Sequence, residues 1–112
     1  MKKIVDILKA LSDETRLRII NLLYVKELCV CDIFETLKIS QTKASRHLRY
    51  LKNAGLVVDR KHAQWAYYSM LKNRDISFLD ILIRENIGAS EPFKSDLINL
   101  EIWLKRRNNI CD

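Results

Sequence analysis

The chain has 112 residues, of which 48% are apolar and 30% are charged, and these proportions are typical of one globular domain. Two glycines and one proline leave few helix breaks, so we expect a mainly helical fold. No stretch approaches the length of a membrane span, and Asp6 and Lys9 interrupt the basic start too early for a signal peptide. We therefore expect a cytoplasmic protein that has no membrane partner.

The net charge of +6 is concentrated in the middle of the chain. Residues 36–74 contain nine lysines and arginines but one acidic residue, Asp59, whereas the rest of the chain is slightly acidic. Such a basic region is typical of proteins that bind nucleic acid. On charge alone, a basic surface that contacts only solvent is as good an interpretation as a nucleic-acid-binding region. The predicted secondary structure has to decide between them.

The chain begins with two predicted helices, at residues 2–11 and 12–24. Apolar residues recur with helical spacing in the first. In the second, Leu17, Ile20 and Leu23 form an apolar stripe behind a serine and an aspartate that can cap the helix. Each helix therefore has one face suited to a core.

Two further helices are predicted at residues 30–38 and 39–55, joined by a tight link. Ser40 suits the N-cap of the second helix, and Gly55 lies just past its end, where a C-cap glycine belongs. The second helix of such a pair normally enters the major groove of DNA.

Residues 56–70 are rich in valine and aromatic side chains and predict a two-stranded β-hairpin with its turn near residues 62–64. A short helix, a tight link, a second helix and a hairpin together make a winged helix-turn-helix with the hairpin as the wing. Two more helices are predicted at residues 75–88 and 91–108. We expect one mainly α domain over residues 1–112, with a DNA-binding core at about residues 15–70.

The predicted helix at residues 39–55 has an apolar face and, opposite to it, a polar and basic face without an acid. The inner face carries Ala44, Leu48 and Leu51. On the outer face, arginine can bind guanine and glutamine can bind adenine. We assign Lys43 or Arg49 to phosphate, which receives half or more of such contacts, and we favour a packed or capping role for His47. The predicted DNA contacts of this helix are Gln41, Thr42, Lys43, Ser45, Arg46 and Arg49.

The tip of the predicted hairpin is also basic and polar. Such a tip can reach the DNA backbone or the minor groove. Its candidate DNA-binding residues are Arg60, Lys61, His62 and Gln64. Charge, helix pair and hairpin together predict double-stranded DNA as the partner.

Two of the three cysteines, Cys29 and Cys31, lie one residue apart in the stretch ELCVCDI. On a regular helix their side chains would point about 200° apart, but at a helix start they can converge on one ion. An odd number of cysteines in a reducing compartment argues against a structural disulfide. Lys26 and the helix N-terminus predict a lowered thiol pKa, and thiolates select soft ions.

Other uses of the cysteine pair stay open at this point. The two residues could be buried core residues, or a redox pair that forms a disulfide or a sulfenic acid. A thiol–disulfide oxidoreductase would normally have an α/β scaffold, whose strands are missing here. No glycine-rich phosphate loop and no histidine–carboxylate–serine set is present, so we expect a protein that is not an enzyme and has no catalytic residues.

Three stretches, ELCVCDI, SQTKASRHLRYLKNAGLVVDRK and QWAYYS, together resemble the ArsR (ArsR/SmtB) family of metalloregulatory repressors, and within it the arsenite-responsive members. The resemblance runs from about residue 4 to residue 70. It implies a homodimeric repressor that binds operator DNA of a resistance operon and is released when As(III) or Sb(III) binds Cys29 and Cys31, without an organic cofactor. It also implies a dimer built from the first and last helices, at about residues 2–11 and 91–107.

The sequence departs from this family pattern at two positions. Phe34 stands where arsenite-responsive relatives have a third cysteine, so a third ligand would come from Cys111, a small cellular thiol or water. Ala63 stands in the hairpin tip where relatives often have glycine. A repressor that responds to thiol oxidation through Cys29 and Cys31 is the alternative to an arsenite sensor. The sites that other members use for cadmium, lead or zinc lack their ligands here.

Overall fold

The computed structural model describes residues 2–71 and 77–111, with side chains for residues 3–71 and 77–107. The elements in chain order are α1 (Lys2–Leu11), α2 (Glu14–Leu23), β1 (Leu28–Cys29), α3 (Val30–Leu37), α4 (Gln41–Asn53), β2 (Val57–His62), β3 (Trp65–Met70), α5 (Phe78–Ile81), the π-helical turn η2 (Leu82–Ile87) and α6 (Phe93–Cys111). This order confirms the predicted mainly helical, winged helix-turn-helix fold. Within the described ranges, no helix combines the length and the apolar character that crossing a membrane requires.

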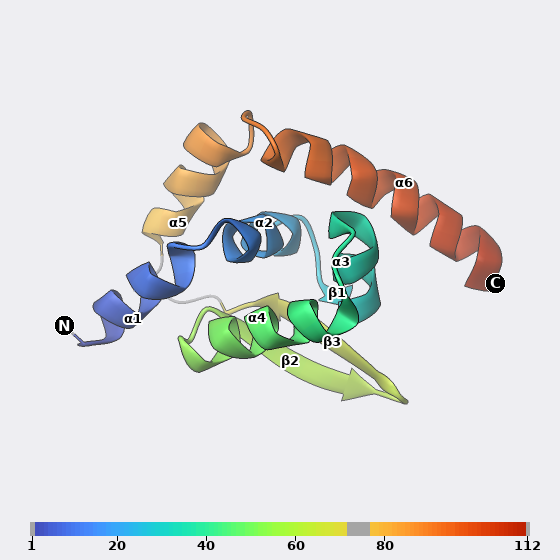
Figure 1. Cartoon of the computed structure of the whole chain (residues 1–112), viewed down its shortest axis with the longest axis horizontal. Coiled ribbons are helices and arrows are strands. Elements are labelled where there is room, and N and C mark those ends of the chain that lie inside the picture. The colour runs from blue at the N-terminus through green and yellow to red at the C-terminus, as the bar shows by residue number, and fades with distance from the viewer. Residues whose placement is uncertain (1, 72–76, 112) are drawn as a thin grey trace.

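The core is built around α2, which lies between α5 and α6 on one side and α4 with the sheet on the other (Figure 1). Ile19, Ile20 and Leu22 of α2 are fully buried. Helix α4 adds the three apolar residues of its predicted inner face, which are likewise fully buried: Ala44, Leu48 and Leu51. Burial of large aliphatic side chains stabilises the fold by about 1.5–3 kcal/mol each.

Local signals fix the α3–α4 pair as the sequence predicts. Helix α3 ends at Leu37 and is capped by Lys38, whose backbone is left-handed with φ 58°, and the three-residue link 38–40 leads to α4. The Ser40 hydroxyl accepts a hydrogen bond from the Lys43 N–H at 3.1 Å and so caps α4. Gly55, with φ +81°, follows the end of α4 in a conformation that favours glycine.

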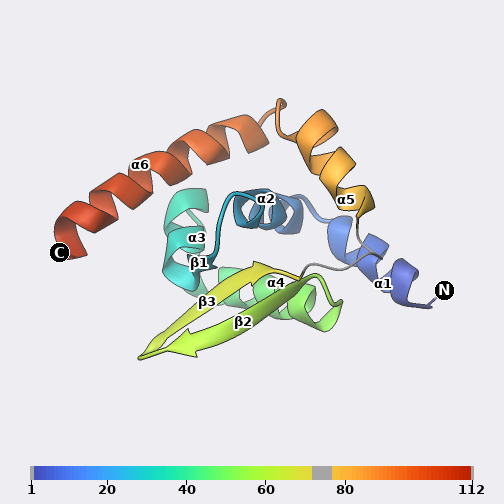
Figure 2. The same ribbon diagram turned by 180° about the vertical axis from the view of Figure 1, so that it is seen from behind.

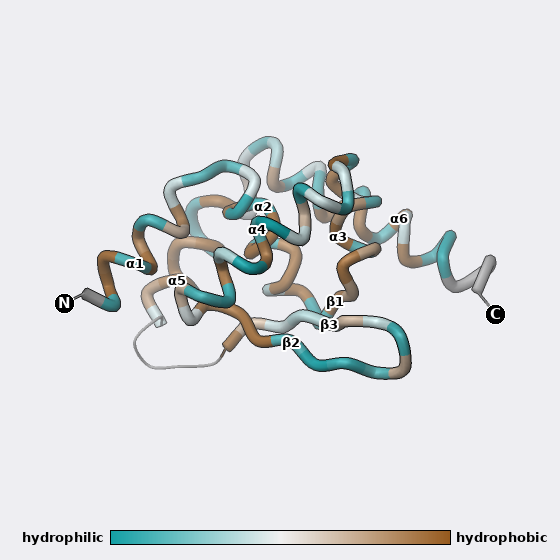
Figure 3. The backbone as a smooth tube through the Cα atoms, turned by 60° about the horizontal axis from the view of Figure 1, so that its bottom comes forward, coloured by the Kyte–Doolittle hydropathy of each residue, from teal (hydrophilic) through white to brown (hydrophobic). Residues whose placement is uncertain are grey.

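The sheet has three strands rather than the predicted two. Strand β1 pairs antiparallel with β3, with Leu28 opposite Tyr68 and Cys29 opposite Tyr67, and the strand order is β1-β3-β2. The hairpin of β2 and β3 extends away from the helices (Figure 2). Ala63 in its turn has φ 57°, so alanine occupies a left-handed position where glycine carries no strain. Most of β2 is hydrophilic (Figure 3), which agrees with the predicted polar and basic hairpin tip.

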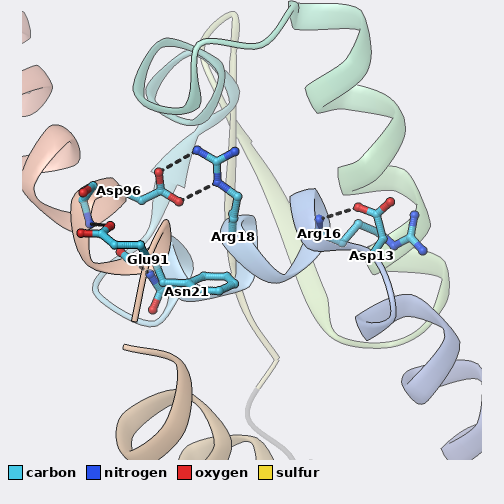
Figure 4. A network of polar contacts seen from close by, with 8 residues as sticks. Asp13, Arg16, Arg18, Asn21, Glu91 and Asp96 are labelled. Carbon is cyan, nitrogen blue, oxygen red and sulfur yellow. Dashed lines mark hydrogen bonds and ion pairs between the residues drawn. The ribbon is translucent and has the colours of Figure 1, made fainter. Parts of the chain in front are cut away.

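Helix α6 folds back over its own chain. Near its start, the Arg18 guanidinium donates two hydrogen bonds of 2.8 Å to the buried Asp96 carboxylate, and the Asn21 amide donates to the Phe93 carbonyl at 3.2 Å. Figure 4 shows these contacts between α2 and α6, together with the hydrogen bond between Asp13 and Arg16 at the start of α2. Further along, α6 packs on α3. The assignment of residues 91–107 to a dimer surface stays a prediction.

Candidate thiol site and nucleic-acid interface

Cys29 and Cys31 meet where β1 passes into α3. Cys29 ends the strand and is also the N-cap of α3, with extended backbone angles of φ −83° and ψ 165°. Cys31 lies in the first helical turn. Because the chain is not yet helical at Cys29, the two Sγ atoms and a carboxylate oxygen of Asp32 all lie within 4.8 Å of one another. The predicted convergence of the two thiols at a helix start is confirmed.

Asp32 holds this turn together and links it to α6. Its Oδ2 accepts the Cys29 N–H at 3.0 Å, which closes a capping box at the start of α3. Its Oδ1 accepts the Trp103 indole N–H at 2.9 Å, and the Arg107 Nη1 lies 3.2 Å and 3.3 Å from the two oxygens. With 1% of its surface exposed, Asp32 is a buried charge whose oxygens already have donors. We call Asp32, Trp103 and Arg107 the Asp32 clamp.

The sequence analysis missed the Asp32 clamp. The spacing of Cys29 and Asp32 is that of a capping box, and this signal could have predicted the contact between the Asp32 carboxylate and the Cys29 N–H. Trp103 and Arg107 lie more than seventy residues further along the chain, so no local pattern indicates their contact with Asp32.

The predicted lowering of the thiol pKa is wrong for Cys31. Burial raises the pKa of Cys31 to about 12, and the hydrogen bond with the Cys29 thiol and the negative charge of Asp32 act in the same direction. The Arg107 charge opposes this shift. The helix N-terminus favours an anion, but burial and the neighbouring carboxylate outweigh it here. Cys31 is therefore a protonated thiol at neutral pH.

Among the described side chains, no third cysteine joins Cys29 and Cys31. Phe34, at the position of the third cysteine in relatives, is half-buried and packs against the core. Cys111 belongs to the last turn of α6, and its side chain lies outside the described residues. Two thiols and a carboxylate that is already hydrogen-bonded are thus the donors that the structure brings together.

The predicted polar face of α4 is exposed to solvent over most of its residues. Four of the six predicted contacts are exposed, namely Gln41, Thr42, Arg46 and Arg49, and Lys43 and Ser45 are half-buried. His47 is buried, with Nδ1 3.4 Å from Nη1 of Arg16, which agrees with the packed role expected for it. Burial also lowers the pKa of His47, so its side chain is neutral near pH 7.

The wing presents its four predicted DNA contacts on the surface: Arg60, Lys61, His62 and Gln64. Arg60 already has a partner, because its guanidinium makes two hydrogen bonds, of 2.9 Å and 2.8 Å, to the Glu27 carboxylate. It also lies over the Tyr67 ring, 5.0 Å from the ring centre. Glu27 precedes β1, so this ion pair connects the wing to the strand that ends in Cys29.

Known proteins with similar sequences are regulators. Residues 13–58 match the family described as "Bacterial regulatory protein, arsR family". The arsenic resistance transcriptional regulator ArsR1 of Pseudomonas putida is 45% identical over 90 residues, which cover 80% of this chain and 70% of ArsR1.

Two solved structures share the fold. HlyU from Vibrio cholerae has a TM-score of 0.70 at 35% identity, covering 76% of this chain and 92% of HlyU. The "homodimeric winged helix-turn-helix DNA-binding domain" of Mb0332 from Mycobacterium bovis has a TM-score of 0.66 at 27% identity, covering 80% of this chain and 86% of the domain. These similarities agree with the prediction of a DNA-binding regulator that is not an enzyme.

Proposed function

Because the chain belongs to the bacterial arsR regulatory protein family, we propose that it is a cytoplasmic transcriptional repressor that binds operator DNA as a homodimer. We further propose that As(III) or Sb(III) releases it by binding the thiols of Cys29 and Cys31. The observation that carries this proposal is the convergence of the two Sγ atoms within 4.8 Å at the start of α3. A chain similar to an arsenic resistance regulator thus places two soft donors at one point.

The high pKa of Cys31 suits arsenite better than a divalent cation. Arsenite at neutral pH is an uncharged trihydroxide. When each arsenic–sulfur bond forms, one arsenic–oxygen bond breaks, and the thiol proton leaves with the hydroxide as water. The protonated Cys31 thiol therefore binds arsenite without net release of its proton, whereas Cd²⁺ or Zn²⁺ must first displace the proton of a thiol with a pKa of about 12.

A third thiol would replace the remaining hydroxide, and we propose Cys111 or an external thiol for this role. Support for Cys111 comes from the path of α6, which meets the thiol site at Arg107, four residues before Cys111. Asp32 is a weaker candidate, because its two oxygens already accept hydrogen bonds from the Cys29 N–H, Trp103 and Arg107.

Two elements connect the thiols to the DNA-binding surface. Helix α3 packs directly on α4, the proposed recognition helix. Strand β1 pairs Cys29 with Tyr67 of the wing, and Glu27 binds Arg60 of the wing. An ion that draws the two sulfurs together distorts the junction of β1 and α3, and so changes the placement of both α4 and the wing. DNA and arsenite then favour different conformations and weaken each other's binding.

A homodimer would place two copies of α4 on a two-fold operator, about 34 Å apart in the major groove. Helix α1 offers an apolar surface for it, because Ile4, Val5 and Leu8 are 37%, 45% and 53% exposed. Helix α5 lies at the same end of the molecule in both views (Figures 1 and 2) and adds the exposed Ile81. Residues 91–107 can contribute through Ile98 and Ile102, which are also exposed.

Fluorescence anisotropy of the reduced protein on a labelled duplex from upstream of its own gene tests the proposal. Arsenite is titrated into the complex, with cadmium and zinc in parallel and peroxide as a fourth arm. We expect release by arsenite at concentrations where zinc has no effect. Release by peroxide alone would replace the arsenite sensor with the redox alternative, which the protonated state of Cys31 disfavours because the thiolate is the reactive form. Absence of duplex binding would refute the repressor.

A further inference from the structure

A groove of about 460 Å³ separates α6 from the link between α3 and α4. The link and the start of α4 contribute Lys38 and Gln41 to its lining, and α6 contributes Asn99 and Arg106. Glu35 is the acidic residue that also lines it. The groove therefore adjoins the N-terminal turn of the proposed recognition helix, from which base contacts usually come.

Three consecutive basic residues of α6 differ in their partners. Lys105 forms an ion pair with Glu101 at 3.5 Å, and Arg107 belongs to the Asp32 clamp. Arg106, between them, is exposed at the groove and has no acidic partner among the described residues. Lys38, which faces the same groove from the link, likewise has none there. Two positive charges from distant parts of the sequence thus remain available beside α4.

The Asp32 clamp fixes the segment that carries Arg106. Trp103 and Arg107, which flank Arg106 on the helix, both bind the buried Asp32 of α3. The backbone at Arg106 is therefore anchored to α3, the helix that is paired with the proposed recognition helix α4. A contact made from an anchored backbone loses less conformational freedom on binding than one made from a mobile tail.

We propose that Arg106 and Lys38 form an accessory phosphate-binding site for the DNA backbone, next to the bases contacted by α4. This inference rests on the proposed function and extends the DNA-contacting surface from the winged helix-turn-helix to the C-terminal helix. The guanidinium presents a fork of donors that fits two phosphate oxygens. Because a phosphate contact carries no sequence information, this site adds affinity for any duplex and no preference for sequence.

The test compares Arg106→Gln with Lys105→Gln, which removes the same charge from the neighbouring residue of the same helix. Anisotropy is measured on the operator and on an unrelated duplex, between roughly 50 and 200 mM salt. We expect Arg106→Gln to weaken both complexes by the same factor. It should also make the negative slope of the log association constant against log salt less steep, by about one for each protomer. Lys105→Gln should change the slope much less, and Lys38→Gln should act like Arg106→Gln.

Equal slopes for Arg106→Gln and Lys105→Gln would overturn the inference, as would a loss confined to the operator, which would indicate base contact. Circular dichroism melting of each variant shows whether the fold is retained, and Lys38→Gln supplies the second reading if Arg106→Gln does not fold. If the wild-type protein binds no duplex, the proposed function fails and this site fails with it. If the wild type binds and responds to arsenite while Arg106→Gln matches Lys105→Gln, the accessory site alone is refuted.

Discussion

Replacing Asp32 with asparagine should destabilise the protein more than any single change at its surface. Asp32 is 1% exposed, and its carboxylate accepts hydrogen bonds from the Cys29 N–H, the Trp103 indole and Arg107. Asparagine keeps the shape but turns one acceptor oxygen into a donor, which then faces a donor of the clamp. It also removes the charge opposite Arg107.

The expected change in the free energy of unfolding follows from the hydrogen-bonding partners of Asp32 that the substitution leaves unpaired. A buried hydrogen bond to a charged group contributes about 1.5–3 kcal/mol, and a buried donor without an acceptor costs about 1–3 kcal/mol. The Arg107 side chain is 26% exposed and can form hydrogen bonds with water instead, so the loss of its ion pair with Asp32 costs less free energy. We expect Asp32→Asn to lower the free energy of unfolding by about 3 kcal/mol, or the melting temperature by about 12 °C for a domain of this size.

Urea unfolding at one fixed protein concentration measures this change, because the stability of a dimer depends on protomer concentration. Trp103→Phe, which removes one hydrogen bond and keeps an aromatic ring, should fall between the wild type and Asp32→Asn. Asp59→Asn is the matched control, since Asp59 is a partly exposed carboxylate paired with Lys52 at 2.9 Å, and it should have a much smaller effect. A free energy of unfolding for Asp32→Asn within about 0.5 kcal/mol of the wild type would refute the reasoning.

Three further predictions concern ligand and DNA. The affinity for Cd²⁺ should rise about tenfold per pH unit between pH 7 and 9, because the ion must displace the Cys31 proton, while the affinity for arsenite stays nearly constant. Calorimetric titration of both ligands checks this, and parallel pH profiles would contradict the assignment of a protonated Cys31 thiol. Cys29→Ser should leave operator binding intact but abolish its response to arsenite in the anisotropy titration; a variant that arsenite still releases would remove the proposed site. Arg46→Ala should weaken operator binding by about 1–3 kcal/mol while arsenite binding is unchanged; equal operator affinity would remove Arg46 from the reading face.

The features that the sequence predicted correctly are those that local chemistry decides. Ser40 caps α4 because its hydroxyl reaches the Lys43 N–H three residues later, and Gly55 ends the helix because its φ is +81°. The inner face of α4 follows from helical spacing alone. The convergence of Cys29 and Cys31 could likewise be predicted, because it depends only on where the helix begins.

The features that the sequence missed depend on contacts between distant residues. Strand β1 has two residues, too few for an alternating pattern, and it exists because β3, about forty residues later, pairs with it. The pairing of Asp32 with Trp103 spans 71 positions. The pKa shift of Cys31 was predicted in the wrong direction. The helix N-terminus can be recognised in a sequence, whereas the burial of Cys31 and the effect of the Asp32 charge on it cannot.

These distant contacts give the thiol site three connections to the proposed DNA surface. Cys29 belongs both to the strand that pairs with the wing and to the cap of the helix that packs on α4. Asp32, next to Cys31, anchors the α6 segment that carries Arg106. A small ion bound by both sulfurs acts at the one turn where these elements join, so a local distortion reaches several DNA contacts at once.

This arrangement constrains the energetics of release. Each contact that weakens adds to the coupling free energy between arsenite and DNA, and linkage requires that DNA weaken arsenite binding by the same factor. If the connections act separately, Arg106→Gln should reduce the factor by which arsenite weakens DNA binding without removing it, because the wing and α4 remain coupled to Cys29. If that factor is unchanged, the clamp holds α6 in place but transmits nothing, and release then depends on the junction of β1 and α3 alone.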